Sequence, residues 1–141
     1  MLDIVKDMIK HKKVWTIEPE ASVYDAISKM SDKQIGALIV TEDNKVIGII
    51  TERDYARKVI LQDKSSKNTL VREIMTKRVI YVKPDQKLEE CMALMTNSHI
   101  RHLPVLDGDR LVGMISIGDV VKAVISEKEF LIDQLTRYIS A

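Results

Sequence analysis

The alternation of apolar and polar positions repeats along this chain with an offset of 65 residues. Residues 14–60 and 79–125 align without a gap, and 11 of the 47 aligned positions are identical. Each copy orders a short apolar run, an amphipathic helical stretch, two apolar runs of strand length and a second helical stretch in the same way. The pattern therefore predicts a duplicated βαββα unit, which places the chain in the α+β class.

The first copy shows how each element is encoded. Apolar residues spaced by three and four predict a helix from Val23, and Ser22 with Asp25 resembles the capping box at its start. The branched, apolar runs Ala37–Thr41 and Val46–Ile50 predict a hairpin, because polar turn residues separate them. These strands are nearly continuous in apolar residues, so we expect both faces of the sheet to be covered.

The domain boundaries follow from the repeat. A polar linker at residues 62–68 separates the copies, which predicts repeats at 1–63 and 69–126. With one gap, residues 4–9 resemble residues 70–75, so each repeat includes a short lead-in helix. Residues 127–141 keep helical apolar spacing and predict an additional C-terminal helix. A unit of about 50 residues is small for independent stability, so we expect the copies to dock about a pseudo-twofold axis.

Composition and charge narrow the functional classes. A content of 45% apolar and 30% charged residues is typical of a soluble globular protein. A net charge of +1 provides no global field for nucleic acid or a membrane surface. The apolar runs, such as Ile35–Val40 and Val46–Ile50, are far shorter than the ~20 residues that span a bilayer. The first residues include acids rather than a secretory signal, and the lone Cys91 fits a reducing compartment. These features predict a cytoplasmic protein.

One motif with chemical potential recurs at the same place in both copies. Thr51 and Asp54 follow the last strand of the first copy, and Ser116 and Asp119 follow that of the second. The hydroxyl caps a helix whose free N–H groups can bind an anion, while the carboxylate can accept hydrogen bonds from two ribose hydroxyls. The alternative is a plain capping box without a ligand. A single occurrence would favour this alternative, whereas recurrence at matching positions in both copies weighs against it.

These features together resemble a tandem pair of CBS domains, the module named after cystathionine β-synthase and also called a Bateman module. The resemblance covers essentially Leu2–Ile125 and rests on the βαββα order, on Gly48 and Gly113 in the last strands, and on the motif that follows each glycine. The second copy also carries the family-like string His-Ile-Arg-His-Leu-Pro-Val at residues 99–105. The first copy departs from it, with Ile39 where the family often has proline.

The resemblance implies a stand-alone, non-catalytic regulatory module that binds AMP, ADP, ATP or NAD between the repeats and requires no metal. Each ribose acid would work with residues of the opposite copy. Thr51 and Asp54 would face Tyr81, Val82, Ile100, Arg101 and His102. Ser116 and Asp119 would face Ile17, Ala21, Ile35, Gly36 and Ala37. Arg101 and His102 are the cationic members and are suited to a phosphate.

Several alternatives remain open at this point. The chain could be a structural or interaction module with vestigial pockets, or a nucleotide-processing enzyme, which the lack of a recognisable general base disfavours. His99 and His102 have a metal-like spacing, but no acid or cysteine completes a tetrahedral site. Cys91 lies on an apolar helix face and is interpreted as a core residue. We expect a homodimer through the last helices, including Val120, Val121 and Val124, and a regulated enzyme or transporter as partner.

Overall fold

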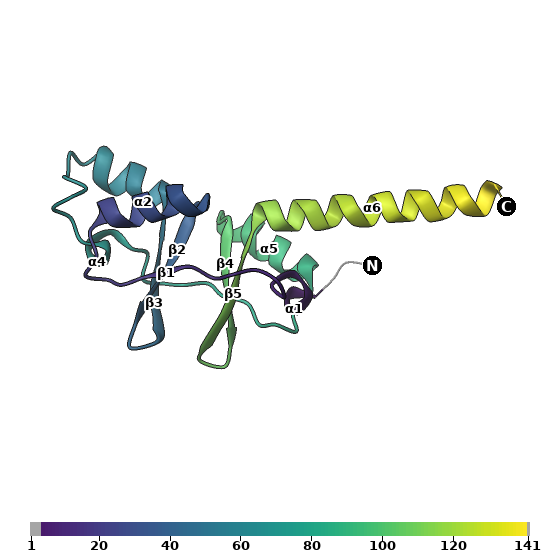
Figure 1. Ribbon diagram of the computed structural model, residues 1–141, viewed down its shortest axis with the longest axis horizontal. Helices are drawn as coiled ribbons and strands as arrows, with labels where there is room; N and C mark the ends of the chain where they lie inside the picture. Colours follow the sequence, from purple (N-terminus) through teal and green to yellow (C-terminus); the bar gives the residue numbers. More distant parts are fainter. Residues whose placement is uncertain (1–3, 141) are drawn as a thin grey trace. The chain divides into compact units, whose positions relative to one another are not determined.

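The computed structural model describes residues 4–140. Residues 1–3 and 141, which the predicted domains 1–63 and 127–141 include, lie outside the described residues. The chain forms two compact units. The first unit comprises Val14–Ile80 and Gly108–Leu111, and the second comprises the residues up to Lys13, Tyr81–Asp107 and the chain from Val112 onward. Both contain helices and strands (Figure 1), which confirms the predicted α+β class.

The first unit is built on a three-stranded sheet of order β1-β2-β3. Strand β1 (Thr16–Ile17) pairs parallel to β2 (Ala37–Glu42), which pairs antiparallel to β3 (Lys45–Thr51). Helix α2 (Val23–Lys33) connects β1 to β2, and α3 (Glu52–Tyr55) follows β3 and continues into the π-helical segment η1 (Ala56–Ile60). The predicted capping box at α2 is half realised, because the Ser22 hydroxyl accepts a hydrogen bond from the Asp25 N–H at 3.0 Å.

The second unit repeats these elements with the predicted offset. Helix α5 (Leu88–Ser98) and strands β4 (His102–Asp107) and β5 (Arg110–Ser116) have the same lengths as α2, β2 and β3. The counterpart of β1 is reduced to one parallel bridge between Val82 and Val105. Pro104 explains the loss, because it stands where Ile39 pairs with Thr16 in the first copy and has no N–H to donate.

The C-terminal helix differs from the prediction in where it begins. Helix α6 runs without interruption from Ile117 to Ser140, so the second helix of the repeat and the predicted helix at 127–141 are one element. No proline interrupts this stretch, and the apolar spacing continues through residue 126. A long helix therefore begins inside the repeat and continues past its end.

The two lead-in helices are exchanged between the copies. Helix α1 (Val5–Met8) belongs to the second unit, where the N–H groups of Val5 and Lys6 donate to the carbonyls of Gln86 and Pro84, each at 2.8 Å. Helix α4 (Val71–Ile74) belongs to the first unit, where Val71 and Arg72 donate to the carbonyls of Ala21 and Pro19, each at 2.9 Å. The four acceptors are equivalent positions of the repeat. The units therefore differ from the predicted repeats 1–63 and 69–126 in which lead-in helix each contains.

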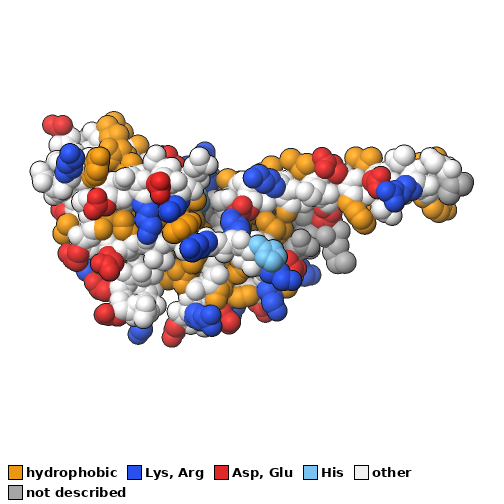
Figure 2. All heavy atoms as spheres, viewed as in Figure 1, with side chains coloured by type: hydrophobic (Ala, Val, Ile, Leu, Met, Phe, Trp, Pro, Cys, Tyr) orange, Lys and Arg blue, Asp and Glu red, His pale blue; other side chains and the backbone are white. Residues whose placement is uncertain are grey.

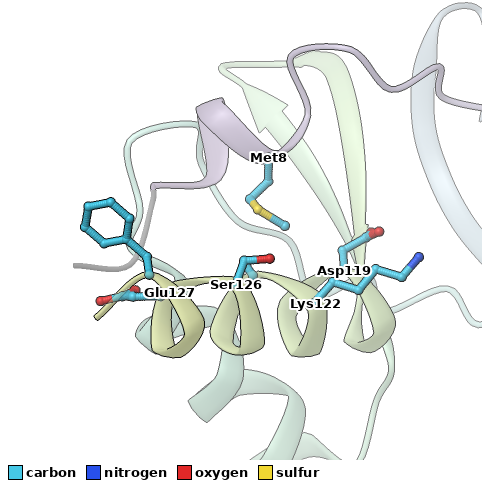
Figure 3. Close-up of a pocket in the computed structure, with 7 residues that line it drawn as sticks. Met8, Asp119, Lys122, Ser126 and Glu127 are labelled. Carbon is cyan, nitrogen blue, oxygen red and sulfur yellow. The ribbon is translucent and has the colours of Figure 1, made fainter. Parts of the chain in front are cut away.

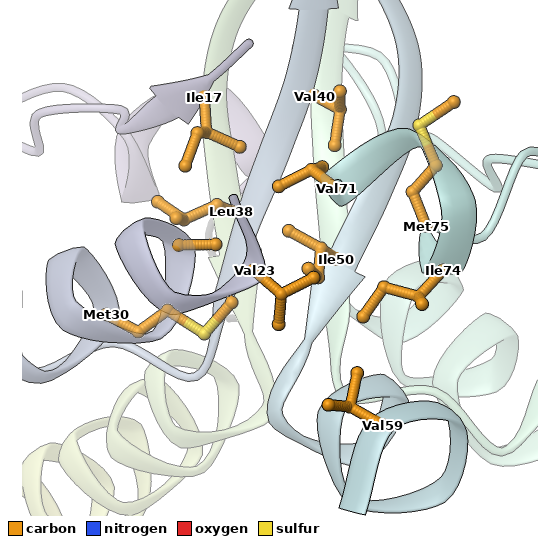
Figure 4. Close-up of a cluster of buried hydrophobic side chains, with 11 residues drawn as sticks. Ile17, Val23, Met30, Leu38, Val40, Ile50, Val59, Val71, Ile74 and Met75 are labelled. Carbon is orange, nitrogen blue, oxygen red and sulfur yellow. The ribbon is translucent and has the colours of Figure 1, made fainter. Parts of the chain in front are cut away.

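The core of the first unit lies between its sheet, α2 and α4 (Figure 4). Leu38 and Ile50 of the sheet, Val23 of α2 and Val71 of α4 are completely buried there. Burying such side chains stabilises a fold by about 1.5–3 kcal/mol each. Because α4 supplies part of this core, the first unit is complete only with the lead-in helix of the second repeat.

Candidate functional site

Each predicted ribose acid lies at the junction between the last strand of its copy and the following helix. The Thr51 hydroxyl accepts from the Asp54 N–H at 3.1 Å, and Asp54 Oδ2 accepts from the Thr51 N–H at 3.0 Å. The equivalent distances for Ser116 and Asp119 are 3.2 and 2.9 Å. Both motifs thus form reciprocal capping boxes, a local arrangement that holds each carboxylate beside a helix N-terminus.

Asp54 is more deeply embedded than the sequence suggests. Only 8% of the surface of Asp54 is exposed to solvent. The Thr76 hydroxyl donates to Asp54 Oδ1 at 3.2 Å, and the Lys58 ammonium lies 3.1 Å from the same oxygen. Lys58 also donates to the Ile74 carbonyl at the end of α4, at 2.9 Å. Asp54 therefore links the capping box to the lead-in segment after α4. This carboxylate has a structural role in addition to any role in ligand binding.

Asp119 has a different set of neighbours, because the lead-in segment after α1 reaches it. The Lys12 ammonium donates to Asp119 Oδ2, the oxygen that also accepts from the Ser116 N–H. Burial raises the pKa of the Asp119 carboxyl, but the Lys12 and Ser116 hydrogen bonds outweigh burial and lower the pKa overall. The lowered pKa means that this carboxylate stabilises the fold above its ordinary pKa of 3.8, and that the contribution is lost as pH falls through the folded value.

The entrances of β2 and β4 lie against these junctions. The Glu52 N–H donates to the Gly36 carbonyl at 3.1 Å, and the equivalent Ile117 N–H donates to the Arg101 carbonyl at 2.9 Å. Next to Arg101, His102 is half-buried, and burial lowers its pKa most. The Asp119 carboxylate opposes this shift, whereas the charges of Arg101 and Lys12 add to it. In the second unit, Asp119, Arg101 and Lys12 thus lie close enough to His102 for their charges to act on it.

The other predicted site residues fall into the two units as follows. In the first unit, Ile17 and Ala37 are buried, and Ala21, Ile35 and Gly36 are half-buried. In the second unit, Val82 is buried, Ile100 is half-buried, and Tyr81 and Arg101 are exposed. The expected pairing of Thr51 and Asp54 with the second group, and of Ser116 and Asp119 with the first, joins residues of different units and stays a prediction.

A pocket of about 570 Å³ adjoins Asp119 within the second unit (Figure 3). Met8 points from α1 toward α6, whose side chains form the rest of the lining from Asp119 to Phe130. Lys122 and Glu127 contribute opposite charges to this lining. The pocket therefore extends the surroundings of Asp119 along one face of α6.

Other candidate chemistry is limited in the part of the chain that the structure describes. Cys91 is completely buried, and burial raises its pKa to about 11, which keeps the thiol protonated and supports its interpretation as a core residue. Among residues 4–140, no cluster of three histidine, cysteine or acidic side chains could hold a metal ion. No helix within the same range is long and apolar enough to cross a bilayer.

Three neighbours of the acids were missed by sequence reasoning. Lys58 follows Asp54 by four residues on one helical segment, a spacing that could have indicated an ion pair. Thr76 and Lys12 carry no such signal, because their contacts depend on the path of the lead-in segments. Lys12 is separated from Asp119 by 107 residues.

Comparison with known proteins supports the resemblance derived from these motifs. The CBS domain model matches residues 5–61 and 71–126. A curated relative from Arabidopsis thaliana, "CBS domain-containing protein CBSX3, mitochondrial", is 46% identical over 123 residues, which cover 84% of this chain and 60% of the relative. The chain spans about three fifths of the length of the first two curated relatives that it matches. Because one relative is mitochondrial by name, the cytoplasmic assignment stays a prediction.

Solved structures agree with the observed fold. A candidate signal-transduction protein with CBS domains from Burkholderia ambifaria MC40-6 is 53% identical, with a TM-score of 0.85 over 88% of this chain and 95% of that one. The CBS domain pair of protein MJ0100, solved in complex with 5′-methylthioadenosine and S-adenosyl-L-methionine, is 27% identical, with a TM-score of 0.82 over 90% of this chain and 99% of that one. With a family model that matches both copies and a shared fold, the chain belongs to the CBS domain family as a pair of CBS domains.

Proposed function

We propose that this CBS pair is a non-catalytic regulatory module that binds an adenine nucleotide, namely AMP, ADP, ATP or NAD, in the cleft between its two repeats. Binding would shift the population of conformations presented to a partner, such as a regulated enzyme or transporter. The second candidate is a structural or interaction module with vestigial pockets. The capping boxes favour this second candidate, because Asp54 and Asp119 already stabilise helix starts without a ligand.

The observation that carries the proposal is the duplicated acid at a strand-to-helix junction. In both units the backbone N–H of the capping residue holds the carboxylate in a fixed orientation at the positive end of a helix. This arrangement combines an acceptor for ribose hydroxyls with a local positive potential for a phosphate. The bound 5′-methylthioadenosine and S-adenosyl-L-methionine of the MJ0100 pair support an adenosine ligand for this chain as well.

The basic side chains of the second unit favour a phosphorylated ligand. Arg101 is exposed and can bind a phosphate through two parallel hydrogen bonds. His102, whose pKa is lowered by burial, would gain a proton more readily beside an anion. The family model that matches the chain is the CBS domain, and the basic side chains serve binding in this proposal rather than chemistry.

Thermal unfolding with a panel of adenosine compounds tests the proposal. At a concentration 100 times its dissociation constant, a ligand that binds only the folded state should add ~2.7 kcal/mol to the free energy of unfolding. We expect a raised melting temperature with at least one of AMP, ADP, ATP and NAD, and none with inosine 5′-monophosphate at equal concentration. If no adenine compound at millimolar concentration shifts the transition, the vestigial-pocket alternative is correct.

The exposed face of α6 supports the proposed homodimer. Apolar side chains of its C-terminal half are exposed (Figure 2), among them Leu131 at 47%, Leu135 at 61% and Ile139 at 80%. Val121 is also exposed, but Val120, which the sequence suggested for the interface, is completely buried in its own unit and cannot contribute to it. An apolar stripe of this length on a helix is typical of a face that a second helix covers.

Substitution of this stripe should dissociate the homodimer. Leu131→Glu combined with Leu135→Glu places charges where each leucine would otherwise contribute about 1.5–3 kcal/mol on burial. We expect a dimer for the wild-type chain and a monomer for the double variant by light scattering at micromolar concentration. Arg137→Glu, which changes the charge on the polar face beside Asp133, should leave the dimer unchanged. A wild-type monomer would refute the homodimer.

A further inference from the structure

Lys12 forms an ion pair with Asp119, one of the two predicted ribose acids. It lies in the segment after α1, which packs in the second unit rather than with its own repeat. Its ammonium donates to Asp119 Oδ2, and its side chain is 42% exposed whereas that of Asp119 is 20% exposed. A cation from the first repeat thus reaches the acid of the second.

The acid of the first copy has different neighbours. The segment after α4 brings Thr76 to Asp54, and a threonine hydroxyl is neutral. The cation beside Asp54 is Lys58, which comes from the same copy and is also held by the Ile74 carbonyl. In the second copy, Ala123 stands at the position equivalent to Lys58. The lead-in segments therefore supply a cation to Asp119 and an uncharged donor to Asp54.

The surroundings of Asp119 make this difference matter for ligand choice. The charges of Asp119, Arg101 and Lys12 all act on the His102 side chain. Lys122 lines the pocket that adjoins Asp119. An unpaired carboxylate beside a ribose would repel the phosphate attached to the same sugar. Lys12 removes that repulsion, and its flexible four-carbon stem lets the ammonium reach a phosphate while it stays near Asp119.

We propose that Lys12 makes the Asp119 site selective for adenosine ligands that carry a 5′-phosphate, against adenosine, 5′-methylthioadenosine and S-adenosylmethionine. The inference rests on the proposed function, because it presumes that Asp119 accepts a ribose. A neutral thioether gains nothing from the ammonium, and the sulfonium of S-adenosylmethionine is repelled by it. The ligand class at this site therefore differs from the two compounds bound to the MJ0100 pair.

Calorimetry of Lys12→Met with AMP, adenosine and S-adenosylmethionine tests the inference. The variant keeps the apolar stem and removes the charge. Loss of one charge-assisted hydrogen bond should weaken AMP roughly tenfold or more, while adenosine should bind as before and S-adenosylmethionine as before or more tightly. Lys12→Arg should keep the preference for AMP. Lys10→Met, an exposed lysine of the same segment, is the matched control and should behave as wild type.

A second measurement needs no ligand. Carbon-detected NMR titration of the Asp119 carboxyl should show a higher pKa in Lys12→Met than in the wild type, because the Lys12 hydrogen bond lowers it. An unchanged carboxyl pKa would overturn the inference by removing its structural basis. Equal weakening of AMP and adenosine would also overturn it, while leaving the proposed function intact. If the wild type binds no adenosine compound, both the proposed function and the inference fail.

Discussion

Gly113→Ala should destabilise the protein by about 2 kcal/mol, or roughly 8 °C in melting temperature. A Cβ atom at this position would lie 2.8 Å from Cγ2 and 2.9 Å from Cβ of Ile9, in the segment after α1. The Cβ of Ile9 is fixed by its backbone and its branched side chain is stiff at χ1, so relief of the contact requires the backbone to move. The glycine therefore lets the exchanged lead-in segment cross directly over β5.

The equivalent substitution in the first copy should cost less. A Cβ on Gly48 would lie 2.7 Å from Met75 Sδ, which is part of a flexible side chain, and 3.1 Å from the Thr76 carbonyl oxygen. Urea denaturation of both variants measures the difference. Gly118→Ala is the matched control, because its nearest atom would be 3.7 Å away and alanine is favoured over glycine in a helix by ~1 kcal/mol. If Gly113→Ala is as stable as the wild type, the lead-in segment does not cross β5 as described.

Asp54→Asn and Asp119→Asn should each weaken nucleotide binding by about one to two decades. Asparagine keeps the shape of the side chain but lacks the charge that strengthens a hydrogen bond to a ribose hydroxyl, a difference of roughly 1.5–3 kcal/mol. The two variants should differ in stability. Asp54 is buried, accepts from Thr76 and pairs with Lys58, whereas Asp119 is more exposed. We expect only Asp54→Asn to lower the free energy of unfolding by more than about 1 kcal/mol.

Calorimetry with AMP, together with urea denaturation, separates the two effects. Asp109→Asn, in the exposed turn between β4 and β5, is the matched control and should alter neither quantity. The binding assignment would be wrong if both variants, still folded at the temperature of the measurement, bound AMP as tightly as the wild type. In that case the acids would serve only as helix caps.

Local patterns predicted most of the elements correctly. The hydrophobic period placed α2, β2 and β3, and the offset of 65 residues placed α5, β4 and β5 with the same lengths. The reciprocal capping boxes were also predictable, because a hydroxyl and a carboxylate three residues apart interact within one helical turn. The reduction of the first strand in the second copy could have been predicted from Pro104, which lacks the N–H that the pairing needs.

The contacts around the acids were decided by tertiary structure. The exchange of α1 and α4 depends on which copy each lead-in helix packs against, and the same local sequence is compatible with either choice. That exchange brings Thr76 to Asp54 and Lys12 to Asp119, across 22 and 107 residues of chain. The repeat, its elements and the two acids can be predicted without a structure, because they depend on periodicity and short-range capping. The pairing of Lys12 with Asp119 and the hydrogen bond from Thr76 to Asp54 depend on the tertiary structure, because these contacts join segments that no local pattern relates.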